Sequence, residues 1–253
     1  MNYVFPMAGY GKRSSELGAF KPFIKIGDKE IFKHCVSGLG VGDGDTVLCI
    51  ISKETAPEEA SNLLSQYFMD LNVKHVTVVS LDTVPDGPAL TIKEGVKIAN
   101  EIGHSFDDSQ VHVVNVDQII TYSNIELAED ECAMPLYFNN TGASCYVNLS
   151  NNFETIIDIR EKDLISPFAS AGAYLFGCVD LLLDCISWGE TNPDVWVVAP
   201  KYDTKELFVG PCMNYALLNG NVCHPITVTS KIDLGSTNAI NKVKDTIYEY
   251  SIR

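Results

Sequence analysis

The sequence predicts an α/β fold, a doubly wound three-layer α/β/α sandwich with a mixed, mostly parallel central sheet. The first observation is that short apolar runs rich in β-branched residues alternate with longer segments of helical character. The second is size, because 253 residues with a hydrophobic content of 46% suffice for one large domain and its core. No internal repeat or low-complexity linker interrupts the chain, so we expect a single domain over residues 1–253.

In the first half of the chain, strands and helices are expected to alternate. The strands are expected at residues 2–5, 46–51, 74–81 and 111–116, and the helices at 31–39, 57–71 and 90–102. The run 46–51 is apolar and β-branched, which is typical of a parallel strand buried on both faces. Because strands that alternate with helices form parallel sheets with right-handed crossovers, a ligand is expected beyond the carboxyl ends of these strands.

The second half of the chain is expected to complete the sheet. Aromatic, threonine and valine side chains mix in 135–149, which predicts strands there, and 222–229 predicts another. Helices are expected at 181–188 and, closing the chain, at 238–250.

The charge of the chain disfavours some classes of partner. With 18 Lys and Arg against 33 Asp and Glu, the formal net charge is −15, so we expect neither nucleic acid nor an anionic membrane as a main partner. We find no signal peptide and no apolar stretch near the roughly 18 residues of a membrane span. The eight cysteines are scattered through apolar runs, which predicts buried, reduced thiols in a cytoplasmic protein and no zinc site.

A small-residue loop directly follows the first strand. Gly9 and Gly11 can adopt positive φ and let backbone N–H groups converge on an anion, while Lys12 and Arg13 add full charges beside them. The loop is neither a Walker A motif nor a dinucleotide fingerprint, since the third glycine of the latter would fall at Ser14. By glycine spacing alone, it could equally be an ordinary strand-to-helix turn.

Local charge favours the phosphate-binding interpretation. Residues 1–33 contain six lysines and arginines against three aspartates and glutamates, a balance of six minus three, or +3, within a strongly acidic chain. A strongly negative protein repels a triphosphate, so a polyphosphate site needs a local region of positive charge.

The same residues carry a resemblance. Pro-Met-Ala-Gly-Tyr-Gly-Lys-Arg at 6–13, followed by Lys21-Pro22 and an apolar strand, resembles the signature of the sugar-phosphate nucleotidylyltransferases. Ala8 replaces the first glycine of that family and Lys12 its small hydroxyl residue, which suggests a divergent branch. The resemblance continues through motifs in the family's order as far as Gly235.

The resemblance implies a reaction and a set of site residues. A phosphate oxygen of an acceptor attacks the α-phosphorus of a nucleoside triphosphate, and pyrophosphate leaves; the acceptor is a sugar 1-phosphate or a similar small phosphate. By resemblance, residues 1–125 form the nucleotide-binding half, with Arg13 and Lys21 as catalytic residues and contacts from Ala8, Gly9, Gly11, Lys12, Asp82, Pro85 and Gly87. Residues 126–253 form the acceptor half, with Glu161, Lys162, Gly172 and Tyr174 facing the acceptor. The stretch 206–215 resembles the family's helix before the last sheet strands.

Magnesium is the implied cofactor. Asp117, after the strand 111–116, and Asp233, in the sequence Asp-Leu-Gly-Ser, match the family's two metal carboxylates. Mg²⁺ commonly takes one or two carboxylates together with phosphate oxygens. Each motif also has a structural interpretation, since a lone aspartate, a Pro-Asp-Gly stretch or a Glu-Lys pair is often simply a turn or a solvated surface.

One departure bears on the base. Asp82 stands where the family commonly has a glutamine that reads the base edge. A carboxylate only accepts hydrogen bonds, so it favours the amino group of cytosine, and hence CTP, over UTP or dTTP.

Two other functions remain open at this stage. Asn115 and Asp117 half-resemble the D-x-D motif of glycosyltransferases that use nucleotide sugars. The departures at Ala8 and Asp82 would also suit a catalytically idle nucleotide-binding regulatory domain. Whether the chain forms a homo-oligomer is left open too.

Overall fold

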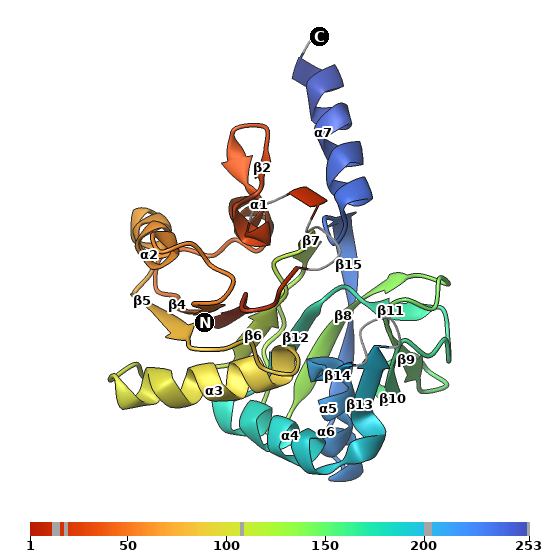
Figure 1. The fold of residues 1–253 in the computed structure, drawn as a ribbon. Helices are drawn as coiled ribbons and strands as arrows, with labels where there is room; N and C mark the ends of the chain where they lie inside the picture. The colour runs from red at the N-terminus through yellow and green to blue at the C-terminus, as the bar shows by residue number, and fades with distance from the viewer. Residues whose placement is uncertain (12–15, 18–19, 107–108, 200–203, 252–253) are drawn as a thin grey trace.

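The structure is a computed structural model that describes residues 1–11, 16–17, 20–106, 109–199 and 204–251. A central sheet of eleven strands organises it (Figure 1). The order along the main path is β10 (Ile156–Glu161), β9 (Cys145–Leu149), β11 (Phe168–Ser170), β8 (Cys132–Phe138), β12 (Ala173–Phe176), β6 (Val111–Val114), β1 (Asn2–Pro6), β4 (Thr46–Ser52) and β5 (His75–Leu81). Off this path, β15 (Cys223–Asp233) pairs with β8 and with β7 (Gln118–Tyr122).

The sheet is mixed, as the sequence predicts. The strands β5, β4, β1 and β6 are parallel neighbours, and the antiparallel pairs gather in the second half of the chain. The pairings leave β1, β4, β5, β6, β8, β9 and β15 running one way and β7, β10, β11 and β12 running the other way. The predicted fold class is therefore confirmed.

Helices cover both faces of the sheet (Figure 1). One face packs against α3 (Pro88–Glu101) and α4 (Val179–Thr191), and the other against α1 (Ile31–Ser37) and α2 (Ala60–Asp70). The strand β1 shows why, because Val4 lies in the core on the α3 side while Tyr3 and Phe5 lie in the core on the α1 side. Such two-sided burial accounts for the continuous apolar runs in the sequence. None of the described helices combines the length and apolar character that crossing a membrane requires.

The region before the last strands differs from the sequence prediction. The residues 206–215 were expected to form one helix, but Glu206 and Leu207 end β14 (Thr204–Leu207), which pairs with β13 (Trp196–Ala199). Phe208 is extended, with φ −97° and ψ 152°, so helical structure begins only at α5 (Val209–Cys212) and continues in α6 (Asn214–Leu218). The pairing with β13 overrides the local helical pattern.

The final strand is also longer than predicted. The expected strand 222–229 runs on to Asp233, because β7 pairs with it from Tyr122 back to Gln118. After it, α7 (Thr237–Ser251) extends away from the sheet toward the C-terminus (Figure 1).

One side chain caps the outer edge of the sheet. The side-chain amide of Asn214 donates to the backbone oxygen of Ile159 at 2.8 Å, and its oxygen accepts from the backbone nitrogen of Ile159 at 3.2 Å. Ile159 lies in the edge strand β10 and is fully buried, so these bonds satisfy backbone groups that water cannot reach.

We expect Asn214→Ala to lower the free energy of unfolding by about 2 kcal/mol, because it leaves a buried N–H and a buried C=O without partners. Urea unfolding followed by circular dichroism measures the change. The matched control is Asn219→Ala, which removes an exposed side-chain bond to the oxygen of Tyr215 and should cost well under about 1 kcal/mol. Equal losses in the two variants would contradict the capping role.

Candidate active site

The loop after β1 is tied to the neighbouring strand ends. The backbone nitrogen of Met7 donates to the oxygen of Ile50, and the hydroxyl of Thr55 donates to the oxygen of the buried Ala8 at 3.1 Å. The hydroxyl of Tyr10 donates to Glu54 at 2.6 Å. These bonds place the predicted phosphate loop at the carboxyl edge of the parallel strands.

The predicted residues of this loop fall into two groups. Gly11 adopts the positive φ of 58° that the sequence analysis anticipates for a glycine here, and Ala8 and Gly9 lie beside it. Lys12 and Arg13 lie outside the described residues, and their roles stay predictions.

Lys21 and Asp117 form an ion pair. The ammonium nitrogen of Lys21 lies 3.2 Å from Oδ2 of Asp117, and the two side chains are only 14% and 27% exposed. Lys21 opens the short 3-10 helix η2 (Lys21–Phe23), while Asp117 follows β6 at the carboxyl edge of the sheet. Two residues that are 96 positions apart in the chain thus meet at one point, as the predicted site requires.

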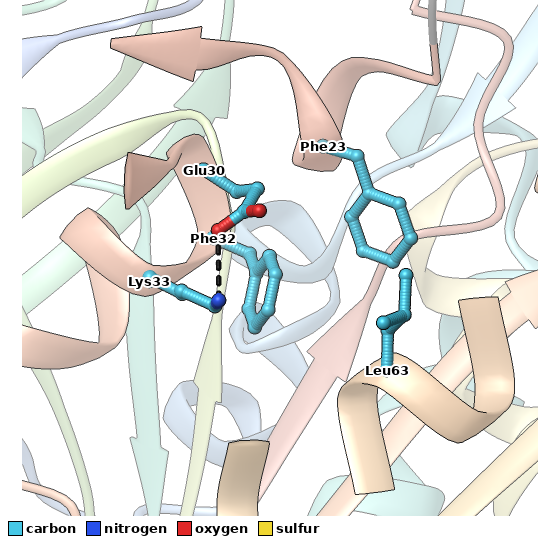
Figure 2. A pocket seen from close by; sticks show the side chains of 5 residues that line it. All are labelled: Phe23, Glu30, Phe32, Lys33 and Leu63. Atoms are coloured by element: carbon cyan, nitrogen blue, oxygen red, sulfur yellow. Dashed lines mark ion pairs between the residues drawn. The ribbon is translucent and has the colours of Figure 1, made fainter. Parts of the chain in front are cut away.

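An aromatic cluster anchors η2, the short helix that begins at Lys21. The ring of Phe23 lies 5.4 Å from the ring of Phe32, and both line a small pocket that Leu63 of α2 closes from the opposite side (Figure 2). At the rim, Glu30 pairs with Lys33 at 2.9 Å. None of the predicted site residues lines this pocket. The aromatic side chains around it instead hold the short helix that carries Lys21.

Asp233 is brought beside Asp117 by backbone pairing. The backbone nitrogen of Leu234 donates to the oxygen of Asp117 at 2.8 Å, and Asp233 is the ladder partner of Gln118. The carboxylate of Asp233 accepts from the backbone nitrogen of Gly235 at 3.1 Å, which fixes it at the strand end. The two predicted metal carboxylates therefore stand at neighbouring positions of one strand pair.

The donor chemistry of these two carboxylates suits a magnesium ion. No group of three or more histidine, cysteine, aspartate or glutamate side chains comes together as a metal cage among the described residues. Mg²⁺ seldom needs such a cage, because one or two carboxylates, phosphate oxygens and water complete its coordination. Asp117 and Asp233 supply hard oxygen ligands of that kind.

Gly172 makes room for a glutamine beside the ion pair. It separates β11 from β12 with φ 81°, and its backbone oxygen accepts from the nitrogen of Asn115 at 2.9 Å. A Cβ atom at this position would overlap the side-chain amide nitrogen of Gln118. Only glycine tolerates both the backbone angle and this contact.

Tyr174 and Glu161 lie in the second half of the chain. Glu161 is the ladder partner of Cys145. Tyr174 is 5% exposed, and burial raises its pKa above the usual range, reinforced by Cys145 and the carboxylate of Glu161. The phenol is therefore neutral at physiological pH and can donate a hydrogen bond.

Lys162 adopts an unusual backbone conformation next to Glu161. Its φ of 57° lies in the left-handed region, and its backbone nitrogen donates to the oxygen of Ser144 at 2.8 Å. The ammonium group lies over the ring of Phe208, 4.6 Å from the centroid.

The predicted base-reading residues are on the loop after β5. Asp82 is exposed and pairs with Lys53 at 2.6 Å, and this hydrogen bond lowers the pKa of the Asp82 carboxyl group. In the same loop, Gly87 adopts φ 111°, and an added Cβ would lie 2.5 Å from the backbone oxygen of Leu207. The nitrogen of Leu207 donates to the oxygen of Asp86 at 2.9 Å, so β14 fixes the loop that carries Pro85 and Gly87.

Comparison with known proteins identifies the fold. No protein-family model and no curated protein matches the sequence. Among solved structures, a nucleoside-diphosphate-sugar pyrophosphorylase from Vibrio cholerae RC9 matches with a TM-score of 0.81 at 17% identity, over 96% of this chain and 99% of that chain. The chain has the fold of this nucleotidyltransferase.

Two further structures share the nucleotidyltransferase fold. An inositol-1-phosphate CTP transferase from T. maritima matches with a TM-score of 0.63 at 13% identity, over 98% of this chain and 96% of that chain. A protein from Bacillus anthracis, assigned as a glucose-1-phosphate thymidylyltransferase and solved with sucrose, matches with a TM-score of 0.64 at 16% identity, over 97% of this chain and 94% of that chain. The fold that the sequence resemblance implies is confirmed.

Some residues of the site were not predicted. Gln118 begins β7 and places its amide against Gly172, a contact for which the sequence offers no local signal. Lys53 follows β4 at the carboxyl edge, where ligands of nucleotidyltransferase-like sheets are expected, and this position could have drawn attention to it. Phe208 carried no signal, because its role depends on the lysine that it meets.

We expect Gly172→Ala to cost about 1–3 kcal/mol more unfolding free energy than Gly142→Ala. Both glycines have positive φ, 81° and 75°, so alanine is under similar backbone strain at the two positions. Only the Cβ at 172 meets a neighbouring side chain, whereas 142 faces open space. Chemical denaturation of the two variants isolates the Gln118 contact, and equal stabilities would show that the contact is absent.

Proposed function

We propose that the protein is a Mg²⁺-dependent nucleotidylyltransferase. It transfers a nucleotidyl group from a nucleoside triphosphate to a sugar 1-phosphate or a similar small phosphate and releases pyrophosphate. The observation that carries the proposal is the Lys21–Asp117 ion pair, with Asp233 held beside it by backbone pairing. The likeness of fold to a nucleoside-diphosphate-sugar pyrophosphorylase and to an inositol-1-phosphate CTP transferase supports it.

The chemistry needs positive charge and positioning more than it needs a nucleophile from the protein. The attacking phosphate is already an anion, and the main obstacles are its repulsion by the triphosphate and the charge that develops on pyrophosphate. We assign Lys21 to the α-phosphate, and Lys12 and Arg13 to the β- and γ-phosphates. Lys21 is partly buried, so its charge acts through little water and is strengthened there.

Magnesium would be held by Asp117 and Asp233. When bound, such an ion neutralises phosphate charge and orients the reacting phosphates. The carboxylate of Asp117 also holds the Lys21 ammonium group, with which it pairs in the free protein.

The acceptor is assigned to the second half of the chain. Lys162 would attract the acceptor phosphate, and Gly172 would seat the amide of Gln118 beside the acceptor. Glu161 would accept hydrogen bonds from acceptor hydroxyl groups, and the neutral phenol of Tyr174 would donate one.

For the base, we propose CTP in preference to UTP or dTTP. The carboxylate of Asp82 only accepts hydrogen bonds, which suits the exocyclic amino group of cytosine. Its partner Lys53 adds a donor beside it for a base carbonyl oxygen. Uracil and thymine carry a carbonyl where cytosine has the amino group, so Asp82 would lose its partner.

We expect Lys21→Ala to lower the rate of pyrophosphate release by about 10²- to 10³-fold, the loss typical of removing one group that stabilises transition-state charge. The assay supplies Mg²⁺, each nucleoside triphosphate in turn and a panel of sugar 1-phosphates, with coupled detection of pyrophosphate. The control Lys25→Ala removes an exposed lysine of the neighbouring strand β2 (Lys25–Ile26) and should keep the wild-type rate.

A full rate in Lys21→Ala would refute the role of this lysine. Release of a nucleoside diphosphate from nucleotide sugars, with no pyrophosphate from triphosphates, would instead identify a glycosyltransferase. Nucleotide binding without either product would identify a regulatory domain.

We expect Asp82→Gln to reduce the ratio of kcat/KM for CTP to that for UTP by about tenfold, since an amide both donates and accepts hydrogen bonds. Steady-state kinetics with both nucleotides measure it. Asp86→Gln, four residues along the same exposed loop, changes the charge equally and serves as the control. An unchanged ratio in Asp82→Gln would remove this residue from base selection.

A further inference from the structure

The acceptor-site lysine is held in a conformation that costs energy. Lys162 directly follows the edge strand β10, and its φ of 57° is rare for a residue other than glycine. Such strain persists only where the surrounding structure enforces it. Here the bond from its nitrogen to Ser144 fixes the backbone, and the ring of Phe208 receives the ammonium group.

Hydrogen bonds fix the backbone at Phe208. The backbone nitrogen of the preceding residue, Leu207, donates a hydrogen bond to the backbone oxygen of Asp86 at 2.9 Å. The backbone oxygen of Phe208 accepts a hydrogen bond from the thiol of the buried Cys212 at 3.2 Å. The backbone that carries the ring is therefore fixed at the start of α5, and the ring lies against the Lys162 ammonium group.

A ring suits this task better than a carboxylate does. The chain has a formal charge of −15, so carboxylates are abundant, yet none of those in the described residues forms an ion pair with Lys162. A carboxylate would hold the ammonium group but would also neutralise it. The negative face of an aromatic ring attracts the cation and leaves its full charge and its outward N–H groups for an incoming anion.

We infer that Phe208 is a positioning residue, which orients the Lys162 ammonium group toward the phosphate of the acceptor by a cation–π contact. This inference rests on the proposed function, because it requires Lys162 to bind the acceptor. It assigns no role in the chemical step, so Phe208 acts on acceptor binding and leaves the nucleotide site alone.

The test is a double-mutant cycle between Phe208 and Lys162, measured by steady-state kinetics with CTP and the sugar 1-phosphate that the wild type uses best. Phe208→Leu removes the ring and keeps an apolar side chain, and it should raise the KM for the acceptor about three- to tenfold. The kcat and the KM for the nucleotide should stay within about twofold. Phe208→Tyr keeps the aromatic face and should restore the wild-type KM. In a Lys162→Met background, Phe208→Leu should have almost no further effect.

The outcomes separate the inference from the function on which it rests. If the wild type releases no pyrophosphate with any pair of substrates, the proposed function fails and the inference falls with it. If the wild type is active but Phe208→Leu leaves the acceptor KM unchanged, the inference alone is wrong. It is also wrong if Phe208→Tyr is as impaired as Phe208→Leu, or if the effect persists without Lys162, since packing would then explain the loss. Thermal melting of each variant confirms that the fold is kept.

Discussion

The ion pair between Lys21 and Asp117 depends on how two distant segments are supported. Lys21 begins a single helical turn. The ring of Phe23 in this turn packs against Phe32 of α1, which fixes the turn. Asp117 lies between β6 and β7. Its backbone oxygen accepts a hydrogen bond from the nitrogen of Leu234, the residue after β15. A half-buried ion pair gains little on balance from attraction alone, because both charges lose hydration. It persists here because the surrounding packing has already set the positions of the two residues. The pair therefore keeps an ammonium group and a carboxylate together at the carboxyl edge of the sheet.

The two halves of the molecule are joined by a bent strand. The residues 168–176 run from β11, which pairs with β9 and β8, into β12, which pairs with β6 and β8. Gly172 stands at the bend, and the amide of Gln118 occupies the space beside it. The sheet therefore changes from the parallel strands β6, β1, β4 and β5 to a mostly antiparallel part beside the candidate site. A second connection runs through Leu207 and Phe208, which contact the base loop and Lys162.

Much of this arrangement could be predicted from the sequence, and the reasons for the exceptions are physical. Strands buried on both faces, such as β1 and β4, carry continuous apolar runs, so the parallel half was predictable. The meeting of Lys21 with Asp117 followed from a resemblance to a family signature. The strands β7 and β14 were missed because their pairing partners decide their structure, and partners that are distant in sequence leave little local signal. For the same reason, Gln118, Lys53 and Phe208 gain their significance only from neighbours that the fold supplies.

The capping of β10 by Asn214 bears on whether two copies of the chain can associate through their sheet edges. A sheet edge normally offers a row of unpaired amides that a second polypeptide can extend, which is a route to fibrils and swapped dimers. One asparagine imitates the missing neighbour strand and occupies the middle of that row with a group that cannot propagate it. At Ile159 the edge is thus occupied by an uncharged side chain, so this part of the protection should be independent of salt.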